Sequence, residues 1–242
     1  MSSFRSLHDL PPLAGVCDFK EAQRPGLSVE ECVRRLKRYH YALKRAHQIF
    51  NNRIPSQPIY ELKMAFSLHS HYCAEHVAAL RKRVGEMREP PLGLKAVPNA
   101  NIEIFFDEIL SAPTTGELLL GLYEVALPAL DDAMRKHLED TNPLVDHPSV
   151  RVIRFAMLEL GEMITLGQAS IEAMVDEATL AKSSSWLGLL SDCLANAGGL
   201  GGEKEHDNNT INRQHSAKPY IYDGVPRRDE RFPDPYNMGV NA

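Results

Sequence analysis

The stretch Glu61–His76, ELKMAFSLHSHYCAEH, decides the fold, because it reads as a core helix and yet carries three histidines and two glutamates. At 3.6 residues per turn, one side of such a helix collects Glu61, Ala65, Leu68, His69, Tyr72 and His76. Buried ionisable groups are costly unless they are paired, hydrogen-bonded or bound to a metal. The stretch therefore predicts a helical bundle with a polar interior that could hold a metal.

The rest of the chain surrounds this stretch with further helical patterns. A capping box formed by Ser28 and Glu31 opens the preceding helix, and Pro55 and Pro58 separate the two. Hydrophobic periodicity then predicts four long helices and one short one, over 28–52, 57–88, 115–140 and 148–180, with the short helix over 100–111. Pro128 lies within the third long helix and should kink it.

These elements predict an all-α fold, a four-helix bundle whose short helix belongs to a crossover connection. The outer junctions are short, and about 25 residues join the second and third long helices, as a crossover between parallel neighbours requires. With a crossover, four side chains lie at similar heights: His47, Glu61, Glu124 and Glu162. Without one, Glu124 and Glu162 instead approach Glu75 and His76. Spacing alone leaves both arrangements open.

Four regions follow from these patterns. Residues 1–27 form an extended lead-in, and residues 28–180 form the helical bundle. Residues 181–202 hold a short helix and the glycine-rich AGGLGG loop, and residues 203–242 form an irregular tail. Because solvated tails are poor in aromatic residues, the aromatic side chains of the tail favour a strap, at 219–236, that packs on the bundle.

Composition excludes several classes of protein. The chain has 242 residues, of which 43% are hydrophobic, enough for one substantial core. Its net charge of -5 gives no basic excess, which makes nucleic acid an unexpected partner. The cysteines form no CxxC pair, so we expect neither a zinc knuckle nor a disulfide framework. With no apolar run of membrane-spanning length and no signal-peptide pattern in residues 1–16, the expected location is the cytoplasm, away from membranes.

Carboxylates and imidazoles that converge from facing helices suit a dinuclear iron or manganese site, in which carboxylates bridge the ions and imidazoles complete their coordination. The candidate metal ligands are Glu61, His69, His76, Glu124, Glu159 and Glu162. Tyr72 lies between the two histidines on the helix and is the candidate to hydrogen-bond a ligand or bound oxygen.

At this point the chain resembles the ferritin-like superfamily over residues 28–180. The resemblance rests on helix order and on two segments that are similar to uncharacterised bacterial ferritin-like proteins, 61–91 and 142–163. The usual ligand pattern of that superfamily is Glu-x-x-His, twice. The helices predicted here lack it, since Glu75 is followed directly by His76 and the last long helix contains no histidine.

Two functions are compatible with these observations. The first is a ferritin-like, non-haem dimetal oxidase or oxygenase, which would use two iron or manganese ions and dioxygen on a small organic substrate. The second is a metal-free helical bundle that serves as a binding or scaffold protein, its buried polar groups satisfying one another. The sequence selects no substrate and leaves a homodimer open.

Overall fold

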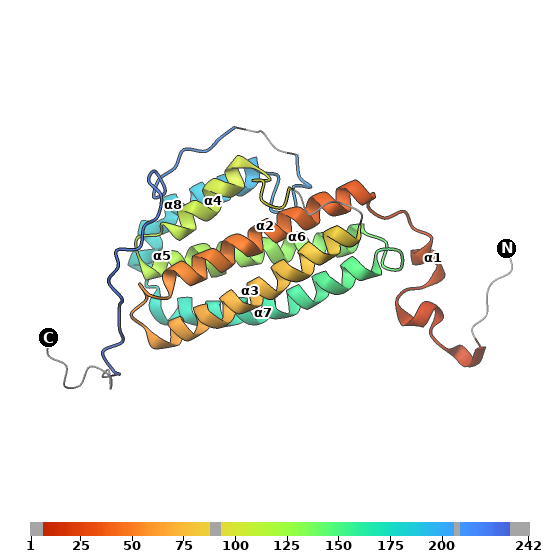
Figure 1. Cartoon of the computed structure of the whole chain (residues 1–242), viewed down its shortest axis with the longest axis horizontal. Coiled ribbons are helices and arrows are strands. Elements are labelled where there is room, and N and C mark those ends of the chain that lie inside the picture. Colours follow the sequence, from red (N-terminus) through yellow and green to blue (C-terminus); the bar gives the residue numbers. More distant parts are fainter. Residues whose placement is uncertain (1–6, 88–92, 206–208, 233–242) are drawn as a thin grey trace.

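The computed structural model describes residues 7–87, 93–205 and 209–232, and every regular element in these ranges is helical (Figure 1). The all-α prediction is therefore confirmed. The elements are η1 (Leu7–Asp9), η2 (Pro12–Gly15), α1 (Phe19–Ala22), α2 (Val29–Arg53), α3 (Tyr60–Glu86), α4 (Ala100–Leu110), α5 (Thr115–Leu119), the π-helical η3 (Leu120–Ala126), α6 (Leu127–Asp140), α7 (His147–Met174) and α8 (Glu177–Asn196). Within the described ranges, no helix is both long enough and apolar enough to cross a membrane.

Four helices, α2, α3, α6 and α7, lie side by side, and each contacts two of the others (Figure 1). Short connections make α2 antiparallel to α3, and α6 antiparallel to α7. Two contacts between α3 and α7, Arg83 with Ser149 and His76 with Glu159, show that these two helices are also antiparallel. It follows that α3 and α6 are parallel, so the connection that contains α4 is a crossover. Membership of the ferritin-like superfamily stays a prediction.

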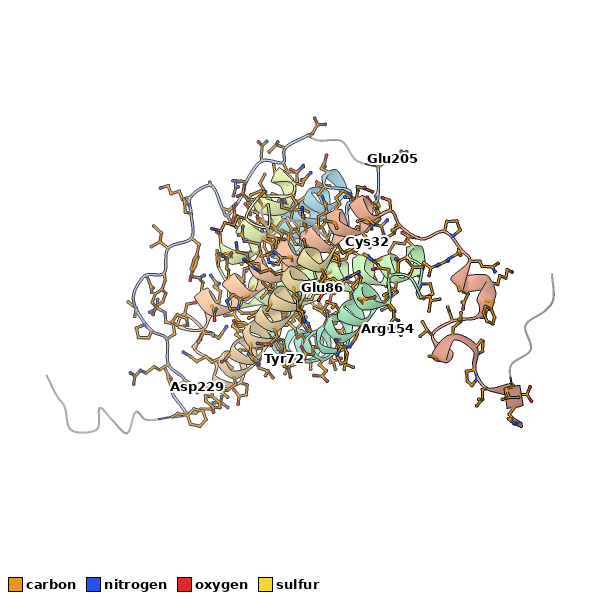
Figure 2. The ribbon with its side chains drawn as sticks, turned by 45° about the vertical axis from the view of Figure 1, so that its right-hand side comes forward. Cys32, Tyr72, Glu86, Arg154, Glu205 and Asp229 are labelled. Atoms are coloured by element: carbon orange, nitrogen blue, oxygen red, sulfur yellow. The ribbon has the colours of Figure 1, made fainter. Side chains whose placement is uncertain are left out.

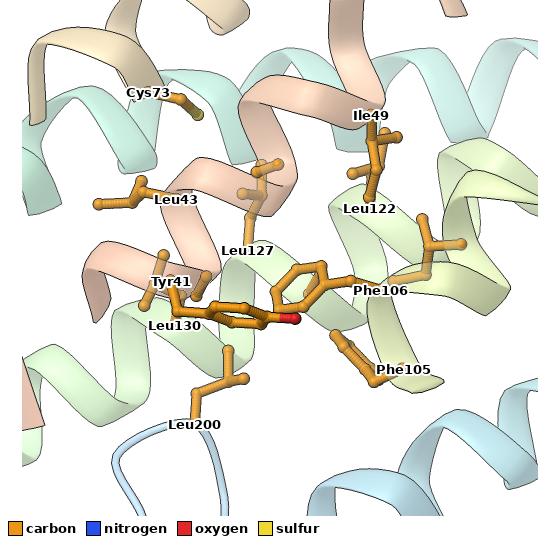
Figure 3. Packing of buried hydrophobic residues seen from close by; sticks show 14 of the residues in the cluster. Tyr41, Leu43, Ile49, Cys73, Phe105, Phe106, Leu122, Leu127, Leu130 and Leu200 are labelled. Carbon is orange, nitrogen blue, oxygen red and sulfur yellow. The ribbon is translucent and has the colours of Figure 1, made fainter. Parts of the chain in front are cut away.

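The core forms where the apolar faces of these helices meet. Ser28 Oγ accepts a hydrogen bond from Glu31 N and starts α2 as predicted, but the Glu31 carboxylate pairs with Arg34 and Arg35 and does not complete the capping box. In Figure 3, Leu43 and Ile49 of α2 lie near Leu122 and Leu127, with α4 packed alongside. Burial of each such side chain contributes about 1.5–3 kcal/mol. The core therefore extends across α2, α4 and the third long helix.

The third long helix is interrupted at η3, directly before the proline that was expected to kink it. Pro128 has no N–H for an α-helical bond to Glu124, and Leu127 N instead bonds five residues back, to Leu122 O. A π-turn holds more residues than an α-turn and rotates the side chains along the helix. The sequence pattern predicts an inward stripe through Leu120, Glu124, Leu127, Asp131, Met134 and Leu138. The structure buries Leu120, Leu127 and Met134 of this stripe, exposes Glu124 and leaves Asp131 and Leu138 half-buried, while Tyr123, Leu130 and His137 are buried beside it.

The helix predicted over 148–180 ends earlier, at Met174, and the short helix predicted within 181–202 is a long one that begins at Glu177. Asp176 Oδ1 accepts a hydrogen bond from Thr179 N and caps a new helix, α8, two residues after α7 ends. Trp186 of α8 is 1% exposed and belongs to the main core. The boundary predicted at residue 180 is therefore misplaced, because α8 packs on α4 as part of the helical body.

Of the two segments that flank this body, the described part of the tail contacts it, while the short helices of the lead-in project away from it (Figure 1). The lead-in predicted as extended contains short helical turns, and Asp18 with Glu21 forms a capping box around α1. The described part of the tail has no regular structure, yet Asp229 accepts a hydrogen bond from Tyr60 N, and Arg227 N donates to Pro55 O. Residues 233–236 of the predicted strap lie outside the described residues.

Candidate metal centre

The structure buries part of the site that the sequence predicts. His69 is 2% exposed, and its Nδ1 lies 2.8 Å from Tyr123 Oη. Burial lowers the pKa of His69 to about 4, so the imidazole is neutral at pH 7. His76 Nε2 lies 2.6 Å from Glu159 Oε2, which links α3 to α7. Tyr72 is half-buried, and its ring stacks near His69 with centroids 6.5 Å apart.

The other three predicted ligands, Glu61, Glu124 and Glu162, are exposed. Because α3 begins at Tyr60 rather than at 57, Glu61 falls in its first turn, where it pairs with Arg231 Nη2 at 2.5 Å. The π-turn directs Glu124 outward, and Glu162 lies on the outward side of α7. The six predicted ligands are therefore not gathered into one group. Only His76 and Glu159 meet, and that pair lacks the bridging carboxylates of a dimetal site.

A different group does converge, at the opposite end of α3 from Glu61. Cys32 Sγ lies 3.4 Å from His137 Nε2 and donates a hydrogen bond of 2.9 Å to Asp146 Oδ2. His137 Nε2 is 3.7 Å from the same carboxylate oxygen. Among the described residues, these three are the set of histidine, cysteine and acidic side chains placed closely enough to share a metal ion.

Three helix ends bring these donors together. Cys32 is the fourth residue of α2, His137 lies in the last turn of α6, and Asp146 immediately precedes α7. The loop between α6 and α7 is fixed by Asn142, whose Oδ1 accepts hydrogen bonds from the N–H groups of Leu144 and Val145. Its side-chain amide donates to carbonyls of the lead-in. The position of Asp146 is therefore set by local turn chemistry.

Further side chains hold the carboxylate. Arg83 Nη2 donates to Asp146 Oδ1 at 3.0 Å, and Thr141 Oγ1 donates to Oδ2 at 3.0 Å. Arg83 Nε also donates to Ser149 Oγ, which fixes the guanidinium. Burial opposes ionisation of Asp146, but its hydrogen bonds, with His137, Cys32, Ser149 and Arg83, outweigh burial and lower the pKa of this carboxyl. Asp146 is thus a carboxylate at neutral pH.

The Cys32 thiol, in contrast to Asp146, favours its neutral, protonated form. Burial, followed by the hydrogen bond to Asp146 and its negative charge, raises the pKa of Cys32 to about 12. The positive charge of Arg83 only partly offsets this rise in pKa, so Cys32 is a neutral thiol and a poor nucleophile at pH 7. Its one proton is donated over the shorter contact, to Asp146. His137 Nε2 faces both Cys32 and Asp146 and is the ring nitrogen that a metal would take, in exchange for its hydrogen bond with Asp146.

The donor atoms lie close to the separations of one face of a tetrahedron, with the Sγ–Oδ2 hydrogen bond shorter than a shared metal requires. Zinc–donor distances of about 2.0–2.3 Å imply separations of about 3.3–3.6 Å between tetrahedral donors. The observed separations run from 2.9 to 3.7 Å. A thiolate, an imidazole and a carboxylate together favour zinc among the common divalent ions. A metal cation bound here would displace the proton of Cys32 and stabilise the thiolate by its positive charge.

A cavity of about 310 Å³ adjoins the site. Its walls are formed by Leu27, Val29, Cys32, Arg83, Glu86, Met87, Val145 and Asp146. Cys32 and Asp146 thus border the cavity, while His137, which is fully buried, lies behind them. Figure 2 labels Cys32 on α2 and Glu86 on α3. An ion held by the three donors would have an open side toward this space.

Sequence reasoning missed this group for identifiable reasons. Cys32 was considered only for CxxC spacing, and the predicted stripe passes through Met134 and Leu138, next to His137 but not through it. If the helical spacing is counted only from the residues after Pro128, one side of the helix carries Leu130, Met134 and His137, all of which are buried. The sequence therefore contained a pattern that indicates an inward-facing His137. Comparison of the chain with protein-family models, with curated proteins and with solved structures finds no match.

Proposed function

We propose that this chain is a metal-dependent protein with one zinc ion held by Cys32, His137 and Asp146, and that the ion activates water for hydrolysis of a small substrate. The observation that carries the proposal is the convergence of three zinc-type donors at the wall of a cavity. Structural zinc sites use four protein donors, whereas catalytic ones use three and keep a position open. The cavity therefore favours the catalytic type.

Residues around the donors suit this role. Arg83 acts as the outer partner that orients Asp146, as carboxylates on metals commonly require. Glu86 lines the same cavity, paired with Arg83 at 3.5 Å, and would be the carboxylate that accepts a proton from water. The ion would supply Lewis acidity, lowering the pKa of that water. The apolar walls, including Val29 and Met87, favour a substrate with a small apolar part.

Metal binding tests the proposal. Protein stripped with a chelator and titrated with Co²⁺ should bind about one equivalent and develop thiolate-to-cobalt charge-transfer absorption. Cys32→Ala should abolish that band and weaken binding at least tenfold. Cys193→Ala removes another buried thiol, in α8, and should change neither. Added azide or thiocyanate should perturb the cobalt spectrum if a coordination position is open.

Other results would point elsewhere. Two equivalents of iron, retained by Cys32→Ala and lost in His76→Ala, would favour the dimetal oxidase predicted from the sequence. No bound metal at all would favour the metal-free scaffold. Stoichiometric cobalt with no response to azide would identify a structural ion and overturn the hydrolytic part of the proposal.

A further inference from the structure

The outward side of α3 and α7 carries apolar side chains with no cover among the described residues. Five large side chains on this side are 41–63% exposed: Met64, Leu68, Phe155, Leu158 and Leu166. Scattered exposed leucines need no explanation, but a contiguous apolar surface marks an interaction site. Whether these five are contiguous depends on the register of the two helices.

Two contacts fix that register. Arg83 Nε donates to Ser149 Oγ at 2.7 Å, and His76 Nε2 lies 2.6 Å from Glu159 Oε2. Counting one residue of α7 for each residue of α3 from the His76–Glu159 contact brings Leu68 level with Gly167, next to Leu166, and Met64 one turn further on. Figure 2 shows the two helices adjacent, with Tyr72 on α3 and Arg154 on α7. Leu68, Met64 and Leu166 therefore lie near one another, and Leu158 and Phe155 continue the exposed side along α7, about two and three turns from Leu166.

The ridge of α7 on this surface has a symmetric arrangement of charge. Leu158 is its most exposed large apolar side chain, at 63%. Arg154 lies four residues before Leu158 and Glu162 four residues after it, and both are exposed. Neither forms an ion pair with any residue that the structure describes. Each charge is therefore available to a partner outside the chain.

This spacing fits a second copy of the same chain. In an antiparallel pair of α7 helices with a two-fold axis at Leu158, Arg154 of each copy comes level with Glu162 of the other. Two reciprocal ion pairs then flank an apolar centre, the pattern of a self-complementary interface. We infer that this chain forms a homodimer through α7, with Leu158 at the axis and with Leu68 and Leu166 extending the apolar contact.

Oligomeric state as a function of concentration tests the inference, by sedimentation equilibrium on the full chain. Wild type should dimerise, and Leu158→Glu should be monomeric because it places two like charges at the axis. Glu162→Arg should raise the dimer dissociation constant roughly tenfold, because two attractive pairs become repulsive. The double variant Arg154→Glu/Glu162→Arg should restore wild-type dimerisation.

The control is Asp192→Arg, the same kind of charge reversal at an exposed position of α8, which should leave dimerisation unchanged. A wild type that stays monomeric at all concentrations overturns the inference, as does a dimer that Leu158→Glu leaves intact. If the double variant fails to restore the affinity lost in Glu162→Arg, the antiparallel pairing is wrong. Co-sedimentation of monomeric wild type with vesicles of anionic phospholipid would assign the surface to a membrane instead.

Discussion

Buried histidines are the residues through which this chain responds to acid. Burial lowers the pKa of His69 to about 4, and burial followed by the charges of Lys44 and Arg81 lowers that of His40 to about 4. Unfolding returns both groups to water, where they bind protons below about pH 6.5. Between pH 6.5 and 4 the unfolded state therefore binds more protons, and stability is lost as the pH falls through this window.

Replacement of His69 by glutamine should reduce this pH dependence. In wild type, His69 alone should lower the free energy of unfolding by about 3 kcal/mol between pH 7 and pH 4, and the variant should lack that contribution. Urea unfolding at several pH values measures it. His71→Gln is the matched control, because His71 is exposed on the same helix and is solvated in both states. Equal slopes in wild type and His69→Gln would contradict the assignment.

At the scale of elements, local signals predicted most of the fold. The helices expected over 28–52 and 100–111 are Val29–Arg53 and Ala100–Leu110, because capping side chains and apolar periodicity act within a few residues. The π-helical segment could not be read in the same way. The pattern predicted only a kink at Pro128, whereas the segment before it changes to bonds five residues back, which shifts the side chains that α6 turns inward.

The candidate metal centre could not be predicted from the sequence either, because it depends on contacts between distant parts of the chain. The contacts of Cys32 with His137 and Asp146 join residues more than 100 positions apart in the chain. His137 faces inward only if α6 has the correct rotation about its own axis. The end of α6 lies beside the start of α2 only because the connection through α4 is a crossover. The sequence does predict burial of His69 and His76, since both lie on the uninterrupted α3.

Contact between α7 and the π-helical segment depends on Gly167. A Cβ at this position would overlap the Cβ, Cγ and Cδ1 atoms of Tyr123, which is fully buried and cannot move aside. Gly167→Ala should therefore destabilise the chain by about 1–3 kcal/mol or more, despite the better helix propensity of alanine. Thermal and urea unfolding measure the change.

Gly188→Ala provides the comparison for that variant. Gly188 is exposed within α8, and a Cβ there meets nothing within 4 Å. The substitution should stabilise the chain by roughly 0.5–1 kcal/mol. Destabilisation of both variants alike would show that the effect is not the contact with Tyr123.

At the scale of the whole molecule, the tail is tied to the helices through a buried carboxylate. Glu108 is 0% exposed and accepts hydrogen bonds from the N–H groups of Gln214, His215 and Ser216, from Ser216 Oγ and from Trp186 Nε1. Burial of Glu108 opposes its ionisation, but these hydrogen bonds outweigh burial and lower its pKa. Glu108 is thus a buried charge whose partners come largely from the tail.

Truncation separates this anchor from the later strap. A chain that ends at Gly202 loses four of the five donors to Glu108 and should be less stable by about 3 kcal/mol or more, since an uncompensated buried charge is costly. A chain that ends at Lys218 keeps these donors and should lose much less, because the strap contacts of Asp229 and Arg231 are exposed. Urea unfolding and protease sensitivity measure both. If the two truncations are equally destabilising, the anchor lies in the strap, and if neither changes stability or protease sensitivity, the tail is not docked.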